Sequence, residues 1–420
     1  MKKGQSPGFW LLSAIMMVVM IGFAGCVKRT TLEEGPWLGV IAIDSADHSL
    51  AIPFTFNYTV VPGGESFIEV SNAGEIIQIH EYTVSGDTFT MKFPVFSAGI
   101  VAVLRNDSMV GSYYPKGIGA GTAYRFYALK GVTDRFPWFT EAPSGNVSGR
   151  WRVVENPGSS DSAVMVGEFL QEGSRVTGTV LSTGGDYRYL EGKVAGNRFM
   201  VSAVDGAHSL VLTAEIAASG SLVNGRFLGS PGWRTTWRAE RNDTIRLPKT
   251  DALVKVKPGA PPFAFSFPDF NGDTVSLSDP RFFGKVVIVQ AAGTWCPNCM
   301  DEAVFFSQLY EKCHDKGLEI VALCFEDKTF TDSKPKMERF ALHTEARYPF
   351  LYAGPRGRGA LAAVFYNLEG PMAYPTTQFI DRKGAVRRVE TGFTGPGTGD
   401  HYLDYTAEIT QFVEELLAEK

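Results

Sequence analysis

The chain has 420 residues, of which 44% are hydrophobic, and its formal net charge at pH 7 is −5. This length exceeds one ordinary domain, so two or three domains with hydrophobic cores are expected. The acidic balance and the lack of a basic cluster in the sequence argue against nucleic acid as a partner.

The first 26 residues have the pattern of an exported segment. Lys2 and Lys3 precede an apolar stretch, Phe9 to Ala24, and a glycine then leads to Cys26. This order resembles a bacterial lipoprotein signal peptide, which implies cleavage before Cys26 and a lipid on its thiol. The alternative is an uncleaved anchor helix, for which the stretch is short, since crossing a bilayer takes about 20 apolar residues. Both interpretations predict an exported protein held at a bacterial membrane, facing the periplasm or the cell exterior.

The sequence from Trp37 to about Asn242 is typical of β-strands. Short alternating runs, such as Leu50–Tyr58 and Thr88–Phe93, are separated by glycine-rich turn signals such as Pro62-Gly63-Gly64. This spacing predicts antiparallel strands in sandwiches or barrels.

The β region also contains similar segments at a nearly constant separation, which indicates an internal repeat. Segments that begin at Pro36, Gly86, Ser108 and Arg125 are followed, 110 to 114 residues later, by similar segments that begin at Arg150, Gly196, Leu222 and Thr236. We therefore expect two β modules of one design. Coincidence among strand and turn patterns is the alternative.

A proline-rich linker precedes a different pattern. Four prolines between Leu247 and Pro262 favour extended chain at a boundary. Strand and helix patterns then alternate, which indicates an α/β domain. Strands are expected at Val286–Val289, Leu318–Phe325, Tyr374–Asp381 and Ala385–Glu390, and helices after Cys299, over Lys334–His343 and around Tyr405–Leu416. The predicted division is signal peptide 1–25, tether 26–36, β modules 37–145 and 146–245, linker 246–260 and α/β domain 261–420.

Two cysteines separated by two residues follow the first of these α/β strands. Cys296 and Cys299 stand between the apolar run Val286–Val289 and a helical pattern, the arrangement of a thiol–disulfide site. At this spacing the two thiols can form a disulfide, and the helix N-terminus favours the thiolate of the first. A zinc site is the alternative, but it needs two further ligands, and the remaining cysteines, Cys26, Cys313 and Cys324, are singly placed.

Several segments in the α/β region resemble the thioredoxin-like TlpA/ResA group of thiol–disulfide proteins. They are Pro262–Phe265 with Gly272, Gly284–Val289, Trp295–Cys299 and Tyr374–Asp381. The second β module, with its segment Gly185–Gly192, resembles β regions that precede TlpA-like domains in some bacterial lipoproteins. One departure is Gln290–Gly293, where the group usually carries Asn-Phe-Trp-Ala, and we expect it to alter the surface beside the site. The resemblance implies a thioredoxin-like fold and exchange of disulfides with protein substrates.

The resemblance also implies roles for three further residues. A glutamate near the position of Glu326 lies under the thiol pair in this group and tunes its protonation, with Asp327 as an adjacent rival. Pro375 stands where thioredoxin-like proteins carry a cis-proline facing the cysteines, and an ordinary trans proline is the alternative. Trp295 is expected to shield the thiols or touch substrate, or else simply to pack.

The predicted mechanism is dithiol exchange. Cys296 attacks a substrate disulfide and Cys299 resolves the mixed disulfide, with no metal or organic cofactor. The resemblance favours reduction of substrate, which requires an electron donor that the sequence does not identify. Cys313 and Cys324 are expected to be inert core residues, with a regulatory disulfide between them as the alternative.

Three other functions are also compatible with the sequence. A thioredoxin-fold peroxidase usually has a threonine where Gly293 stands. A surface-binding lipoprotein would use its β modules, with aromatics such as Trp233 and Trp237 lining a ligand face. A copper-delivery protein would add a histidine near the thiols, and the unassigned candidates are His314, His343 and His401.

Overall fold

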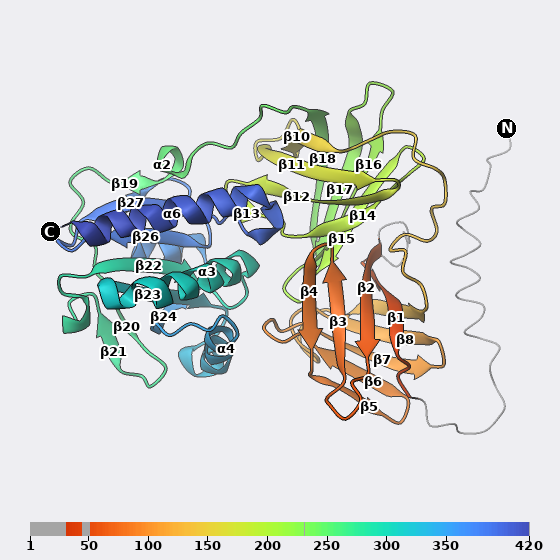
Figure 1. Ribbon diagram of the computed structural model, residues 1–420, viewed down its shortest axis with the longest axis horizontal. Helices are drawn as coiled ribbons and strands as arrows, with labels where there is room; N and C mark the ends of the chain where they lie inside the picture. The colour runs from red at the N-terminus through yellow and green to blue at the C-terminus, as the bar shows by residue number, and fades with distance from the viewer. Residues whose placement is uncertain (1–30, 44–50, 231, 420) are drawn as a thin grey trace.

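The computed structural model describes residues 31–43, 51–230 and 232–419. The predicted signal peptide, residues 1–25, and the lipidation site Cys26 lie outside this range. No described helix is long and apolar enough to cross a membrane. Figure 1 shows the two β modules at one end of the molecule and the α/β domain at the other.

The first β module is a rolled antiparallel sheet. Among its described residues, nine strands pair in the order β4-β3-β2-β1-β9-β8-β7-β6-β5. The chain passes from β4 to β5 through His80 and Glu81 alone, so the sheet curls to bring its two ends together. Trp37, Phe54 and Phe126 are fully buried in its core. The strands are β1 (Gly35–Ala42), β2 (Ala51–Thr59), β3 (Phe67–Asn72), β4 (Glu75–Ile79), β5 (Tyr82–Ser85), β6 (Thr88–Lys92), β7 (Gly99–Arg105), β8 (Ser108–Tyr114) and β9 (Tyr124–Lys130).

The second β module is a closed antiparallel barrel. Its described strands pair in the order β11-β10-β18-β17-β16-β15-β14-β12-β13, and a further pairing of β11 with β12 closes the series. Closure leaves no open edge in the ring of strands. Trp151, Phe199 and Trp237 belong to its buried core. The strands are β10 (Gly149–Glu155), β11 (Ala163–Glu172), β12 (Arg175–Ser182), β13 (Gly185–Asp186), β14 (Leu190–Ala195), β15 (Arg198–Val204), β16 (Ser209–Ile216), β17 (Leu222–Ser230) and β18 (Trp233–Arg241).

The two modules share one design, as the repeated segments predict. β1 lies between β2 and β9, just as β10 lies between β11 and β18. Trp37 and Trp151 occupy matching strands and are both fully buried, and so are Phe89 and Phe199. The strand pattern therefore correctly predicted an all-β region of two similar modules.

The described α/β domain is built on a mixed five-stranded sheet, in the order β24-β23-β22-β26-β27. β22 (Val286–Ala292), β23 (Leu318–Glu326) and β24 (Phe350–Pro355) are parallel. β26 (Thr376–Ile380) runs antiparallel to β22, and β27 (Val386–Thr391) runs antiparallel to β26 and therefore in the direction of β22. Alternate residues of β22 face opposite sides, so Ile288 packs in one buried cluster and Val287 in another.

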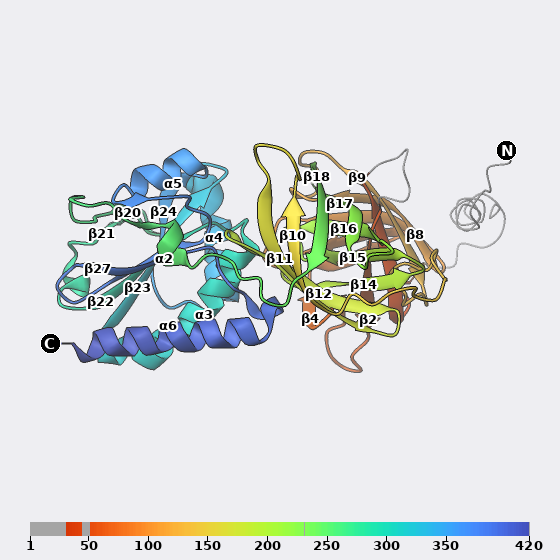
Figure 2. The ribbon, with the colours of Figure 1, turned by 90° about the horizontal axis from the view of Figure 1, so that it is seen from above.

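Helices cover both sides of this sheet. Figure 2 shows α5 on one side and α3 with α6 on the other. Helix α4 begins at Phe330, four residues before the predicted Lys334, because the Thr329 side chain caps its N-terminus. The helices are α2 (Thr250–Leu253), α3 (Pro297–Cys313), α4 (Phe330–His343), α5 (Arg358–Val364) and α6 (Asp400–Ala418), and the short strands are β19 (Lys255–Val256), β20 (Ser266–Pro268), β21 (Thr274–Ser276) and β25 (Leu368–Glu369).

Candidate active site

The two cysteines of the motif lie where β22 gives way to α3. Cys296 is the residue that caps α3, and its sulfur accepts a hydrogen bond of 3.2 Å from the backbone N–H of Cys299. The two residues form a disulfide with their Cα atoms 5.2 Å apart. Cys296 is 5% exposed and Cys299 is fully buried. A helix N-terminus stabilises negative charge, so the Cys296 sulfur is placed to ionise when the disulfide is reduced.

The loop before β26 faces this disulfide. The peptide bond between Tyr374 and Pro375 is cis, as predicted for Pro375. The carbonyl oxygen of Tyr374 lies 3.6 Å from the Cys296 sulfur. The structure therefore brings Pro375 and the thiol pair together.

The Trp295 side chain, next to Cys296 in the sequence, packs against neighbouring residues of the α/β domain. Its indole N–H donates a 2.8 Å hydrogen bond to the carbonyl of Phe325, and its ring meets that of Tyr374 edge to face. The guanidinium of Arg356 lies 4.8 Å from the indole centroid and also pairs with Asp327 at 2.5 Å. Asp327, the rival to Glu326, thus belongs to a half-exposed ion pair beside the tryptophan.

The departure at Gln290–Gly293 affects the interior, and the expectation of an altered surface is wrong. Gln290, Ala291 and Ala292 are buried in β22, whose two faces are both covered. Gly293 permits a close approach, because a Cβ there would lie 2.4 Å from the indole nitrogen of Trp295.

Glu326 holds the loop that leads into the motif. Its carboxyl group accepts 2.8 and 2.7 Å hydrogen bonds from the backbone N–H and hydroxyl of Thr294, two residues before Cys296. Burial raises the pKa of Glu326, and the two hydrogen bonds from Thr294 oppose that shift.

A second buried carboxyl group, Glu302, was missed by the sequence analysis. It accepts hydrogen bonds from the Gln290 amide at 2.7 Å and from the Thr377 hydroxyl at 3.0 Å. The same amide contacts the Cys299 carbonyl at 3.4 Å. Burial raises the pKa of Glu302 to about 8, so this group can hold a proton at neutral pH behind the thiol pair. Its position one helical turn after Cys299 was the available signal.

The other cysteines lie in the core of the domain. Cys313 and Cys324 are free and buried, and burial raises the pKa of both thiols. Each therefore resists ionisation, which agrees with the expectation of inert core residues.

The remaining candidates do not form a metal site with the thiols. No group of three or more His, Cys, Asp or Glu side chains is arranged to hold a metal among residues 31–43, 51–230 and 232–419. His314 lies 3.6 Å from Glu319 and His401 lies 3.0 Å from Glu168. Of the two tryptophans proposed for a ligand face, Trp237 is a core residue and Trp233 is 43% exposed.

The second β module also reaches the redox motif, through residues that the sequence analysis did not select. Arg188 donates a 3.3 Å hydrogen bond to the carbonyl of Pro297, and the Asn298 amide donates one to the Asp186 carbonyl. Both Pro297 and Asn298 lie between the two cysteines. Figure 1 shows β13 beside the first turns of α6.

Comparison with known proteins agrees with this geometry. The family model described as Redoxin matches residues 256–403. The thiol–disulfide oxidoreductase ResA of Geobacillus kaustophilus is 34% identical over 139 residues, which cover 33% of this chain and 71% of ResA. The chain belongs to the ResA-like redoxin family. It is thus a thioredoxin-like thiol–disulfide oxidoreductase, with β modules outside the matched region.

Two other known proteins resemble this chain at lower sequence identity. Chloroplastic peroxiredoxin Q of Populus jackii is 28% identical over 170 residues, which cover 39% of this chain and 72% of the peroxiredoxin. A solved structure of a putative protein disulfide isomerase from Bacteroides thetaiotaomicron is 22% identical, with a TM-score of 0.31. The match covers 40% of this chain and 94% of the isomerase chain.

Proposed function

We propose that this protein is a membrane-anchored, extracytoplasmic thiol–disulfide oxidoreductase that reduces disulfides in other proteins. The observation that carries the proposal is the position of Cys296 at the N-terminus of α3, where its sulfur accepts the Cys299 N–H. The same contact would stabilise a Cys296 thiolate, which is the species that attacks disulfides.

The reaction balances with the two cysteines alone. The Cys296 thiolate attacks one sulfur of a substrate disulfide, forms a mixed disulfide and releases the other substrate sulfur as a thiolate. Cys299, after losing its proton, attacks the Cys296 sulfur and releases the second substrate sulfur. The substrate gains two electrons and two protons, and the Cys296–Cys299 disulfide remains until an electron donor reduces it.

Groups around the pair support each step. Glu302 lies next to the Cys299 backbone through Gln290, which makes the ionised form of Glu302 our candidate for receiving the Cys299 proton. Glu326 orients the segment before Cys296 through Thr294. The backbone before Pro375 faces Cys296 and is our candidate for pairing with an extended substrate.

Attachment to a membrane rests on the N-terminal sequence. A lipid on Cys26 would hold the globular domains at the outer face of a bacterial membrane. Glutathione does not keep thiols reduced in such a compartment. The pair would therefore need a dedicated electron donor.

Peroxidase activity is the less favoured alternative, despite the similarity to a peroxiredoxin. A peroxidase of this fold would be expected to carry threonine at position 293. A side chain there would meet the indole of Trp295 and the carbonyl of Phe325, so the packing beside Cys296 favours exchange chemistry.

Replacement of each cysteine tests the proposal. Cys296→Ser should abolish reduction of insulin by the full chain, whereas Cys299→Ser should trap mixed disulfides that dithiothreitol releases. Cys313→Ser is the matched control and should retain wild-type activity. Retention of wild-type activity by both motif variants would refute the mechanism.

A further inference from the structure

The segment Thr183–Arg188 of the second β module, here named the capping segment, covers part of the redox motif. Its polar contacts reach the two residues between the cysteines, because Arg188 donates to the Pro297 carbonyl and Asn298 donates to the Asp186 carbonyl, each at 3.3 Å. These contacts join positions more than 100 residues apart in the chain. The β module is therefore a structural part of the redox site.

Glycines allow the capping segment to approach the α/β domain closely. A Cβ on Gly392, which follows β27, would lie 2.8 Å from the Gly184 carbonyl carbon, and a Cβ on Gly185 would lie 1.8 Å from the Asn298 amide nitrogen. A Cβ on Gly184 would lie 3.6 Å from Ala373, two residues before Pro375. The capping segment thus contacts both the motif and the loop that we propose pairs with substrate.

A buried charge cluster holds the capping segment in this position. The Arg188 guanidinium pairs with Asp301 of α3 at 3.2 Å, with Asp205 of its own module at 3.9 Å and with Glu75 of the first module. The Asp186 carboxylate accepts a 2.7 Å hydrogen bond from the backbone N–H of Gly395. Arg188 is therefore the point at which all three domains meet beside Cys296.

The covered site is poorly accessible to a large substrate. Cys296 is 5% exposed, and attack on a disulfide requires its sulfur to approach the target sulfur in line. A small disulfide needs little space around that sulfur, whereas a disulfide on a protein surface brings bulky neighbours against the capping segment.

We propose that the capping segment determines the substrate specificity of this enzyme by limiting access to Cys296. In the closed arrangement, small disulfides and disulfides in narrow extended segments react, and a globular protein reacts only when the capping segment moves away. This inference rests on the proposed function, since it assigns the substrate class of the same thiol pair.

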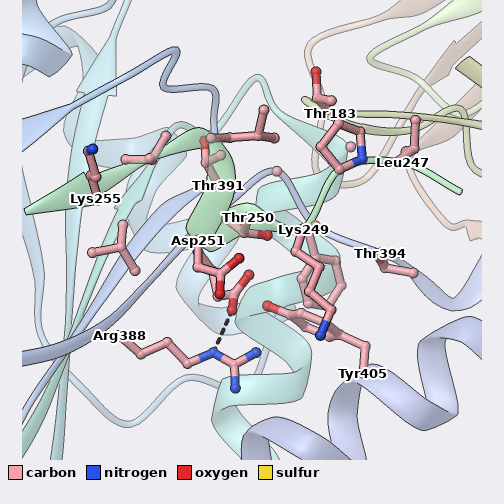
Figure 3. A pocket seen from close by; sticks show the side chains of 18 of the residues that line it. Thr183, Leu247, Lys249, Thr250, Asp251, Lys255, Arg388, Thr391, Thr394 and Tyr405 are labelled. Atoms are coloured by element: carbon pink, nitrogen blue, oxygen red, sulfur yellow. Dashed lines mark hydrogen bonds and ion pairs between the residues drawn. The ribbon is translucent and has the colours of Figure 1, made fainter. Parts of the chain in front are cut away.

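Space for that movement exists on the other side of the capping segment. A cleft of about 570 Å³ lies between the linker, β27 and the middle of α6, and Thr183, Gly185 and Asp186 line one wall of it. Figure 3 shows Thr183 and Leu247 on one side of this cleft, with Arg388 and Tyr405 on another. Thr183, Gly185 and Asp186 can be displaced toward this cleft, whereas Tyr187 of the same segment packs against the core of the second β module.

Arg188→Gln is the direct test, because it removes the charge that holds three carboxylates together. Rates with insulin and with the small disulfide 5,5′-dithiobis(2-nitrobenzoic acid) are measured on the full chain with the same donor. We expect the ratio of the insulin rate to the small-disulfide rate to rise about tenfold, as the fraction of open molecules increases. Arg175→Gln is the matched control, because Arg175 pairs with Glu191 in the same module.

Gly185→Ala provides an independent variant if Arg188→Gln does not fold. The added methyl group displaces the Asn298 amide that bonds to the Asp186 carbonyl, and the φ of +126° at Gly185 strains any other residue, so the substitution should loosen the capping segment from the motif and raise the same ratio. Gly220→Ala is its control, because Gly220 also has a positive φ but has open space around its Cβ position. A ratio within twofold of wild type in the folded variants, or an equal loss of both rates, would overturn the inference.

Hydrogen exchange gives a third readout that needs no substitution in the capping segment. In Cys299→Ser, the mixed disulfide that forms when the Cys296 thiolate attacks a disulfide of intact insulin and releases the other insulin sulfur as a thiolate should accelerate exchange of the Arg188 and Gly395 amides, which bond to Asp186. Unchanged exchange would mean that the capping segment stays in place when a globular protein occupies Cys296, and would count against the inference. If Cys296 forms no mixed disulfide at all, the proposed function itself fails.

Discussion

The side-chain amide of Gln290 donates a 2.7 Å hydrogen bond to the carboxyl group of Glu302, and both side chains are almost completely buried. A carboxyl group in this environment stays protonated to a higher pH than it does in water, because burial penalises its charged form. The pair lies directly behind Cys299, so its protonation is coupled both to folding and to the redox site.

Glu302 should make the folded protein less stable as pH rises. Its pKa is about 8 in the folded state, above its unfolded value, so between about pH 4.5 and 8 the folded state binds the extra proton. Stability should therefore fall across this range, by up to about 1.4 kcal/mol per pH unit from this group. Glu302→Gln should remove that contribution in chemical denaturation measured at pH 5.5 and pH 8.

The control for this measurement is Glu311→Gln on the same helix. The Glu311 side chain is 75% exposed, so its replacement should leave the pH dependence of wild type unchanged. Parallel pH curves for wild type and Glu302→Gln would show that Glu302 ionises normally in the folded protein.

Glu326 should influence the ionisation of Cys296. Removal of a nearby carboxyl group removes a like charge, which lowers the pKa of a thiol. We expect Glu326→Gln to move the pH profile of Cys296 alkylation in the reduced protein to lower pH, by up to about one unit. Asp327→Asn is the control, since Asp327 pairs with Arg356 instead. An unchanged profile would remove Glu326 from the mechanism.

Local patterns predicted the redox motif well, because both thiols and the helix that follows them lie within one short stretch of sequence. Glu302 follows Cys299 by three residues and could have been found by the same local logic. The burial of Gln290 could not have been predicted in this way, because a polar residue that follows an apolar strand run can be either buried or exposed. The contact of Arg188 with Pro297 spans 109 residues, and no local pattern encodes such a distance.

Gly293 should be required for the position of Trp295. A methyl group at this position would collide with the indole and with the Phe325 carbonyl, so Gly293→Ala should displace the ring and break its 2.8 Å hydrogen bond. Overpacking of this kind costs about 1–3 kcal/mol. Tryptophan fluorescence and thermal unfolding measure the two effects. Gly359→Ala in α5 is the matched control, because its Cβ position is open and alanine favours helix.

Asn72 should couple the stability of the two β modules. Its side-chain amide donates to the Val204 carbonyl at 3.0 Å and accepts from the Val204 N–H at 3.1 Å, and Asn72 is fully buried. Asn72→Ala would leave both backbone groups of Val204 unpaired in the interior, and each such group costs about 1–3 kcal/mol. We therefore expect the free energy of unfolding to fall by about 2–4 kcal/mol.

Chemical denaturation of the full chain measures this loss. Asn57→Ala is a suitable control, because the Asn57 amide bonds within its own module, to Thr59. A loss no larger than that of the control would mean that Asn72 does not join the modules energetically. If Asn72→Ala shows a separate unfolding transition of the first β module at lower denaturant concentration, coupling is supported. The first module would then unfold before the barrel and the α/β domain, which means that Asn72 links their unfolding in the wild type.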